Sequence, residues 1–136
     1  MEVKIGQKNI SFGWLWILIG LIVGAFMGMF AFNGPLPSPV GDYTSLPRRM
    51  LRLSHIAFIA LAIINILYGY EIDKIRLMEK TKKSGSWFIL IGAILMPIFL
   101  IIAVFFEPVK YLTMIPTALI IISIFIMVAG EFKKRI

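Results

Sequence analysis

The chain has 136 residues, of which 60% are hydrophobic and 15% charged, and its mean hydropathy is +0.92. A soluble domain is about 45–50% apolar and about 25% charged, and a small domain buries only about two-thirds of the surface that it exposes when unfolded. We therefore predict an integral membrane protein and exclude a soluble or disordered chain. The sequence has no cysteine and one histidine, which excludes disulfides, thiolate metal sites and a cluster of several histidines in one protomer.

Four stretches are long and apolar enough to cross a bilayer, whose hydrocarbon core requires about 20 apolar residues. They cover about residues 12–32, 51–70, 87–106 and 112–129. Because the hydrocarbon core offers no water to the backbone, we expect each stretch to be a helix. The sequence thus predicts an all-α fold, a single transmembrane domain formed by a four-helix bundle with antiparallel up-and-down topology.

The connecting segments differ in length and composition. The longest loop covers residues 33–50 and is kept irregular by its prolines. In the segment 71–86 we expect the second helix to continue through the charged residues 71–76, and the chain to break at residues 82–86. Residues 107–110 predict a tight turn between the third and fourth helices.

The lysine and arginine residues are distributed unevenly between the two sides of the predicted bundle. Of the 14, only Arg48, Arg49, Arg52 and Lys110 fall on one side, and all the others fall on the side of the termini. Because cytoplasmic loops carry the excess of Lys and Arg, we expect both termini in the cytoplasm and the protein in the cell inner membrane. We interpret the net charge of +7 as mainly a signal for orientation in the membrane and as an attraction to anionic lipid headgroups. We expect no binding to nucleic acid.

Lys4 and Lys8 precede the first apolar stretch, as basic residues do in a signal peptide. The apolar stretch is longer than the 7–15 residues typical of a signal peptide. We therefore expect the first helix to be retained.

Small and polar residues within the spans predict how the helices pack. Gly20, Gly24 and Gly28 form two overlapping motifs with small residues four apart, which let membrane helices approach closely. This face fits packing within the chain, and it also fits a seam with a second copy or another subunit. Asn65 lies deep in the second span, where we expect its side chain to form an interhelical hydrogen bond.

One cluster of polar residues is the candidate binding site. Arg48, Arg52 and His55 have the spacing of one helix face, and Arg49 lies beside them. Counting along the spans places four methionines at a similar depth: Met27, Met29, Met50 and Met114.

Three interpretations of this cluster remain open. The arginines bind lipid phosphates or partner carboxylates while His55 forms a hydrogen bond within the bundle. Alternatively, His55 ligates haem and the arginines meet its propionates. In the third interpretation, the methionine sulfurs and the His55 imidazole hold Cu(I).

The segment from Tyr43 to Gly69 resembles small, uncharacterised four-helix membrane proteins of bacteria. The resemblance rests on residues 47–57, where Arg49, Arg52, Leu53 and His55 form the motif Arg-x-x-Arg-Leu-x-His at the start of the second helix. The resemblance adds weight to this motif, but no known activity comes with it.

The predicted function is that of a small non-catalytic subunit or accessory protein of a larger membrane complex, for example a respiratory one. The sequence shows no nucleophile beside a base and no phosphate-binding loop, so we do not expect an enzyme, although an oxidoreductase complex is a suitable host. Its expected partners are the lipid bilayer and either other membrane subunits or a second copy. One alternative is an electron-transfer subunit that binds haem or copper through His55.

A second alternative is a small transporter or channel. Small four-helix proton-coupled drug exporters, which this chain matches in size, depend on a glutamate within the first helix. The spans of this chain contain no carboxylate, and ionisable residues within the membrane are what such pathways require.

Overall fold

The computed structural model describes residues 4–29 and 34–134, which form four long helices and one short 3-10 helix. Their bounds are Gln7–Gly28 (α1), Leu46–Ile72 (α2), Glu79–Phe105 (α3), Glu107–Thr113 (η1) and Met114–Lys134 (α4). Four helical segments are long and apolar enough to cross a membrane. Within the described ranges the only β-type pairing is an isolated bridge between Leu36 and Gly41. The predicted all-α class is confirmed.

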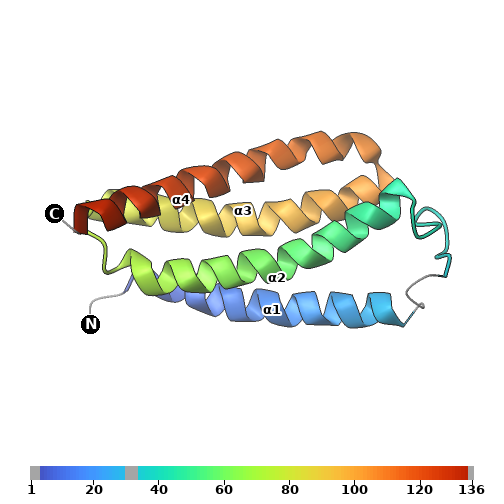
Figure 1. Cartoon of the computed structure of the whole chain (residues 1–136), viewed down its shortest axis with the longest axis horizontal. Helices are drawn as coiled ribbons and strands as arrows, with labels where there is room; N and C mark the ends of the chain where they lie inside the picture. Colours follow the sequence, from blue (N-terminus) through green and yellow to red (C-terminus); the bar gives the residue numbers. More distant parts are fainter. Residues whose placement is uncertain (1–3, 30–33, 135–136) are drawn as a thin grey trace.

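The helices pack side by side in chain order, α1 on α2, α2 on α3 and α3 on α4 (Figure 1). The start of α1 and the end of α4 lie at the same end of the molecule. Between α1 and α2, the close approaches join Gly6 to Gly69 and Gly13 to Ala62. Residue numbers therefore rise along one helix where they fall along the other. This order leaves α1 and α4 as the two outer helices.

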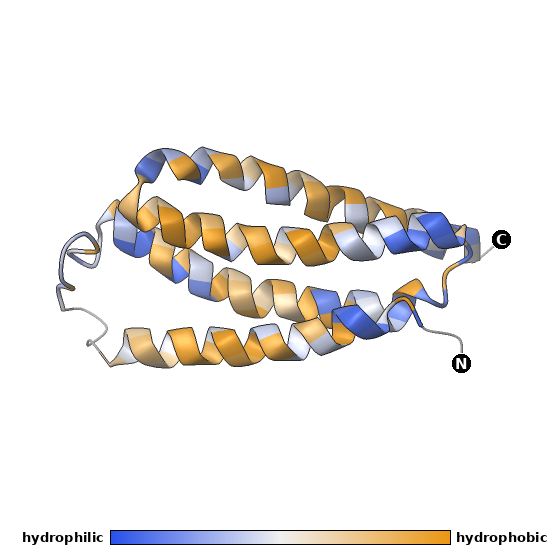
Figure 2. Ribbon diagram, turned by 180° about the vertical axis from the view of Figure 1, so that it is seen from behind, coloured by the Kyte–Doolittle hydropathy of each residue, from blue (hydrophilic) through white to orange (hydrophobic). Residues whose placement is uncertain are grey.

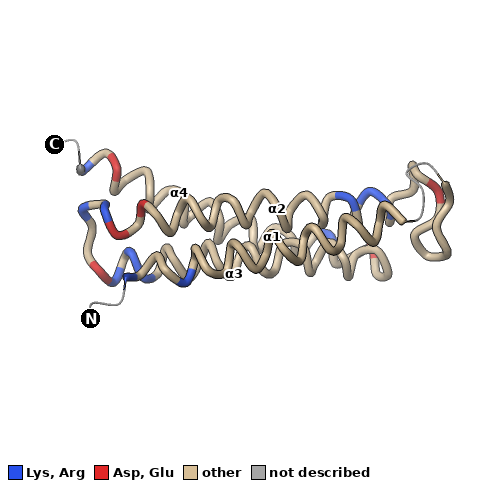
Figure 3. The backbone as a smooth tube through the Cα atoms, turned by 90° about the horizontal axis from the view of Figure 1, so that it is seen from below, with Lys and Arg blue, Asp and Glu red and all other residues tan. Residues whose placement is uncertain are grey.

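Charged and apolar residues are separated along the helix axes. Figure 2 shows the hydrophobic residues along the middle of the helices, and Figure 3 shows Lys, Arg, Asp and Glu gathered towards the two ends. The outer helices also expose large apolar side chains, among them Trp14, Leu18, Leu21, Ile22 and Phe26 of α1 and Ile115, Ile121, Ile122, Phe125 and Phe132 of α4.

Two side chains cap the ends of α1 and α2. Ser45 precedes α2, and its hydroxyl accepts a hydrogen bond from the backbone N–H of Arg48 over 3.3 Å. Asp73 follows α2, and its carboxylate accepts hydrogen bonds from the N–H of Ile5 at 3.0 Å and of Gly6 at 3.2 Å. Backbone N–H groups at a helix start have no partner within the helix. The Asp73 carboxylate therefore satisfies the two N–H groups that directly precede α1, and it joins the start of α1 to the end of α2.

The connection between α2 and α3 differs from the prediction. The helix ends at Ile72 rather than continuing to residue 76, and residues 82–86, where we expected a break, lie within α3. Gly85 and Ser86 are packing positions: a Cβ at Gly85 would lie 2.2 Å from the Tyr68 hydroxyl, and Ser86 is fully buried. Gly85 and Ser86, whose composition suggests a break in the helix, are therefore small residues that let α3 approach its neighbours.

Other boundaries also differ. The helix α2 begins at Leu46, within the predicted loop of residues 33–50. The connection predicted as a tight turn at residues 107–110 is the longer 3-10 helix η1. The helix α1 begins at Gln7, ahead of the predicted start at residue 12, and ends at Gly28. The end of the predicted first span, residues 30–32, lies outside the described residues.

Candidate functional site: a pocket of arginine and histidine side chains

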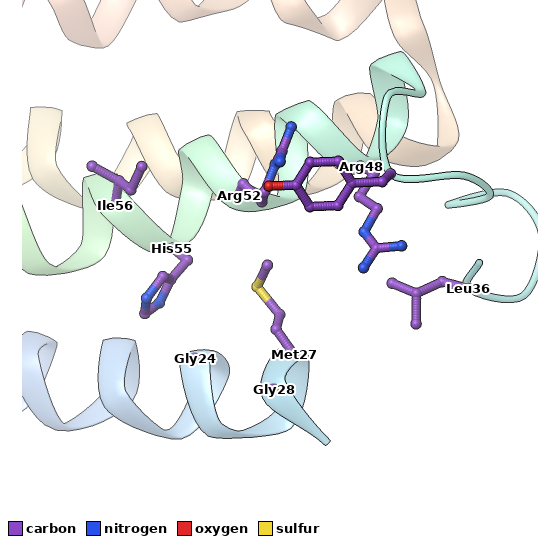
Figure 4. Close-up of a pocket in the computed structure, with 9 residues that line it drawn as sticks. Gly24, Met27, Gly28, Leu36, Arg48, Arg52, His55 and Ile56 are labelled. Atoms are coloured by element: carbon purple, nitrogen blue, oxygen red, sulfur yellow. The ribbon is translucent and has the colours of Figure 1, made fainter. Parts of the chain in front are cut away.

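A pocket of about 260 Å³ lies between α1, α2 and the loop before α2, at the end of the molecule opposite the start of α1 (Figure 4). Of the four predicted polar site residues, Arg48, Arg52 and His55 line it, whereas Arg49 does not. The remaining lining residues are Gly24, Met27, Gly28, Leu36, Tyr43 and Ile56. We call this the arginine pocket.

Tyr43 and the loop backbone position the two arginines. The guanidinium carbon of Arg52 lies 4.2 Å from the centre of the Tyr43 ring, and that of Arg48 lies 5.3 Å from it. Arg48 is only 4% exposed, and its guanidinium donates a hydrogen bond to the backbone carbonyl of Gly34. The face of an aromatic ring attracts cations, so Tyr43 holds two positive charges on one side of the pocket.

His55 reaches from α2 to the backbone of α1. Its Nδ1 lies 3.0 Å from the carbonyl oxygen of Gly20, and because a carbonyl only accepts, Nδ1 carries the proton. In the neutral imidazole this assignment leaves Nε2 as an acceptor. A Cβ at Gly24 would lie 2.4 Å from His55 Cε1, so the imidazole can lie against α1 only because residue 24 is glycine. Figure 4 shows the ring directed from α2 towards α1.

The four methionines predicted at the depth of His55 are not brought together. Met27 lines the arginine pocket, whereas Met50 is half-buried outside its lining. Met29 is 80% exposed and Met114 is 75% exposed, the latter at the start of α4. Among the described residues there is no group of three or more His, Cys, Asp or Glu side chains that could hold a metal ion.

The lining of the arginine pocket combines positive charge with apolar walls. None of the described residues that line it is a carboxylate, and Asp42 in the neighbouring loop is exposed and outside the lining. Met27, Leu36 and Ile56 supply the apolar surface. Guanidinium groups form charge-assisted hydrogen bonds with phosphate and carboxylate groups. The pocket therefore suits an anionic group attached to an apolar molecule.

A second polar cluster lies in the other half of the bundle. The side-chain amide of Asn9 donates to Asn65 Oδ1 at 3.0 Å and to the carbonyl of Ser86 at 3.1 Å, and the hydroxyl of Ser86 donates to Asn9 Oδ1. All three residues are fully buried. Sequence reasoning singled out Asn65 and missed Asn9 and Ser86. The spacing of Asn9 and Gly13, four residues apart on α1, is the signal that points to Asn9.

The predicted packing glycines lie at different positions along α1. A Cβ at Gly20 would lie 2.8 Å from Ile59 Cγ1, Gly24 contacts His55, and Gly28 lines the arginine pocket. Sequence reasoning missed the closest approach, where a Cβ at Gly6 would lie 1.9 Å from the carbonyl oxygen of Gly69. These contacts are made within one chain.

Comparisons of the chain with protein-family models, with curated proteins and with solved structures found no match in any of the three. Function is therefore inferred from the charges, burial and hydrogen bonds of the chain's own residues.

Proposed function

We propose that the chain is a non-catalytic accessory subunit of a larger membrane complex, inserted in the cell inner membrane. It crosses the bilayer four times as an antiparallel up-and-down bundle, with both termini in the cytoplasm. The separation of charge along the molecule supports insertion, because charged residues gather at its two ends (Figure 3). The excess of Lys and Arg on the side of the termini supports the orientation.

The observation that carries the accessory role is the row of helices with two apolar outer faces. The described contacts of α1 are mainly with α2, and those of α4 are mainly with α3 and η1. Each outer helix exposes large apolar side chains to its surroundings. In lipid, such faces serve equally for acyl chains and for the helices of another subunit, and association then depends on close packing. Residues 12–32, 54–70, 87–106 and 112–129 contain no Asp, Glu, Lys or Arg, which favours this role over a proton-driven transporter.

The proposed contact of the subunit with an anionic lipid, cofactor or partner group is the arginine pocket. Its test is purification of the tagged protein in mild detergent, followed by mass spectrometry of everything that co-purifies. We expect stoichiometric partners with the wild type, and loss of the bound species with Arg52→Gln. Arg76→Gln, which removes an equal charge from an exposed residue at the other end, is the matched control. Isolation of the wild type as a lone monodisperse oligomer would contradict the accessory role.

The orientation is tested separately, because the chain has no cysteine of its own. Ser38 and Ser84 are exposed residues near opposite ends of the molecule. We expect a membrane-impermeant maleimide to label Ser38→Cys in intact cells, and to label Ser84→Cys only after the membrane is permeabilised. Equal labelling of both variants in intact cells would refute the proposed topology.

A second candidate function is electron transfer through a cofactor on His55. The hydrogen bond between Nδ1 and the Gly20 carbonyl supports it, since ligating histidines usually donate their other ring N–H to such a partner. Met27, in the same pocket, is the sulfur available beside His55. A Soret absorption band that His55→Ala abolishes would support haem, and bound copper that Met27→Leu removes would support copper. A colourless protein without bound metal excludes this candidate.

A further inference from the structure

A second pocket, of about 490 Å³, opens at the opposite end of the molecule, where α1 and α3 begin. It brings together lysines that are far apart in the sequence: Lys4 and Lys8 near the start of α1, and Lys83 in α3. Ile5, Gln7 and Trp87 complete its described lining, which contains no carboxylate. We call this the lysine pocket.

Three carboxylates near this end have hydrogen-bond or ion-pair partners. Asp73 accepts hydrogen bonds from the backbone at the start of α1. Glu79 pairs with Lys82 at 3.1 Å, and Glu71 pairs with Lys74 at 2.8 Å. Among the described residues, the lining of the lysine pocket therefore presents positive charge and no carboxylate.

An aromatic ring lies between the lysines and the apolar surface of the helices. The ammonium nitrogen of Lys8 lies 3.8 Å from the centre of the Trp87 ring, which is 52% exposed. Tryptophan prefers the level of the lipid headgroups, where its ring is half apolar and half wet. The Lys8–Trp87 pair thus combines a cation for a headgroup with a ring suited to the membrane interface.

Below the pocket, the two helices continue with exposed apolar residues. Lys83, Trp87 and Ile91 follow one another at intervals of four along α3, so they share a face. Leu15 of α1 and Ile91 of α3 are both exposed. Charge, aromatic ring and apolar surface therefore succeed one another in the order of a phospholipid's phosphate, glycerol region and acyl chains.

We propose that the lysine pocket binds the phosphate of an anionic phospholipid, with its acyl chains lying along Leu15 and Ile91. Basic pockets between membrane helices on the cytoplasmic side are suited to such headgroups. The apolar surface that continues from the pocket favours a phosphate that carries hydrocarbon over free phosphate. This inference rests on the proposed membrane insertion.

The test is a titration of the full chain in mild detergent with phosphatidylglycerol, followed by native mass spectrometry, with phosphatidylcholine, which is zwitterionic and has no net charge, as the competitor. Each lysine near an anionic headgroup strengthens binding about fivefold, so we expect Lys8→Gln/Lys83→Gln to bind about 30-fold more weakly than the wild type. The matched control is Lys80→Gln/Lys133→Gln, which removes the same charge from exposed lysines near this end. We expect this control to stay within about twofold of the wild type.

Equal loss of binding in the two double variants would overturn the site, because it would show a response to net charge alone. Displacement of the lipid by inorganic phosphate at equal concentration would show an anion site without a lipid preference and would overturn the proposal. Lys8→Arg/Lys83→Arg keeps both charges, and we expect it to bind as the wild type does. If glutamine at both positions impairs folding, Lys83→Gln alone tests the site, with an expected loss of about fivefold.

Washing membranes with alkaline carbonate separates this proposal from the proposed function. A chain released by the wash is not inserted, and both proposals then fail. A chain that stays in the membrane, while the lysine variants bind phosphatidylglycerol as tightly as the wild type, overturns only the lipid site.

Discussion

The side-chain nitrogen of Asn9 in α1 lies 3.0 Å from the side-chain oxygen of Asn65 in α2, and both side chains are fully buried. The amide of Asn65 also donates to the carbonyl of Leu61 at 3.0 Å, and Ser86 completes the cluster from α3. Three helices are thereby joined by one polar network. A buried network whose members all have partners specifies a single arrangement of the helices, because each alternative packing leaves polar groups unsatisfied.

Asn9→Ala removes the residue that bridges the other two helices. It leaves Asn65 Oδ1 and the Ser86 hydroxyl without this partner, so we expect the free energy of unfolding to fall by about 1–2 kcal/mol. Thermal or SDS-induced unfolding in detergent micelles measures the change. Thr117→Val is the control, since the exposed Thr117 hydroxyl donates to the carbonyl of Thr113, four residues earlier in the chain, and not to α1, α2 or α3. Equal stability of Asn9→Ala and the wild type would show that the network contributes nothing.

Gly13→Ala tests the close approach of α1 and α2. Its Cβ would lie 2.4 Å from Ile66 Cγ1 and 2.7 Å from the backbone oxygen of Ala62, and the backbone cannot turn aside as a side chain can. We expect a loss of about 1–3 kcal/mol in the free energy of unfolding, typical of overpacking. Leu21→Ala, at an exposed position of the same helix, provides the comparison in the same unfolding assay. A Gly13→Ala protein as stable as the wild type is the result that would refute close packing here.

Asp73→Ala removes the carboxylate that caps α1 from the end of α2. We expect a loss of about 0.5–2 kcal/mol, as for other helix-capping side chains. The amide hydrogens of Ile5 and Gly6 should exchange faster with solvent, and hydrogen exchange followed by mass spectrometry detects this locally. Asp73→Asn keeps an acceptor oxygen without the charge, so its free energy of unfolding should lie between those of the wild type and Asp73→Ala. Unchanged exchange at these amides would contradict the cap, and Asp42→Ala controls for loss of an exposed carboxylate elsewhere.

Arg48→Ala tests whether the buried guanidinium anchors the loop before α2. Its hydrogen bond to the Gly34 carbonyl and its position near Tyr43 tie residues 34–45 to the helix. We expect faster cleavage of this loop in limited proteolysis, with α2 otherwise intact. Arg48→Lys should not restore protection, because an ammonium lacks the planar fork of donors. Cleavage at the wild-type rate in Arg48→Ala, or equal acceleration in the distant Arg76→Ala, would contradict the anchor.

The four long helices could be predicted because the length of an apolar stretch is a local property of the chain. The helix boundaries could not be predicted as well, and residues 82–86 show why. Gly85 and Ser86 have the composition of a break, yet they pack against Tyr68 and Asn9 from other helices. Whether a small residue ends a helix or lets another helix approach depends on neighbours distant in the sequence.

The candidate site also has a part that the local sequence predicts and a part that depends on how the helices pack. The spacing of Arg48, Arg52 and His55 determined by itself that they share one face of α2, since about two turns of helix are local geometry. Counting residues also places Met114 at a similar depth, but depth is a coordinate along the helix axis only. The tertiary structure decided which helices are neighbours: α1 packs on α2 and brings Met27 beside His55, while Met114 lies on α4, which packs on α3. Lateral neighbours follow from the packing of small residues and buried polar groups between helices, and no single segment contains that information.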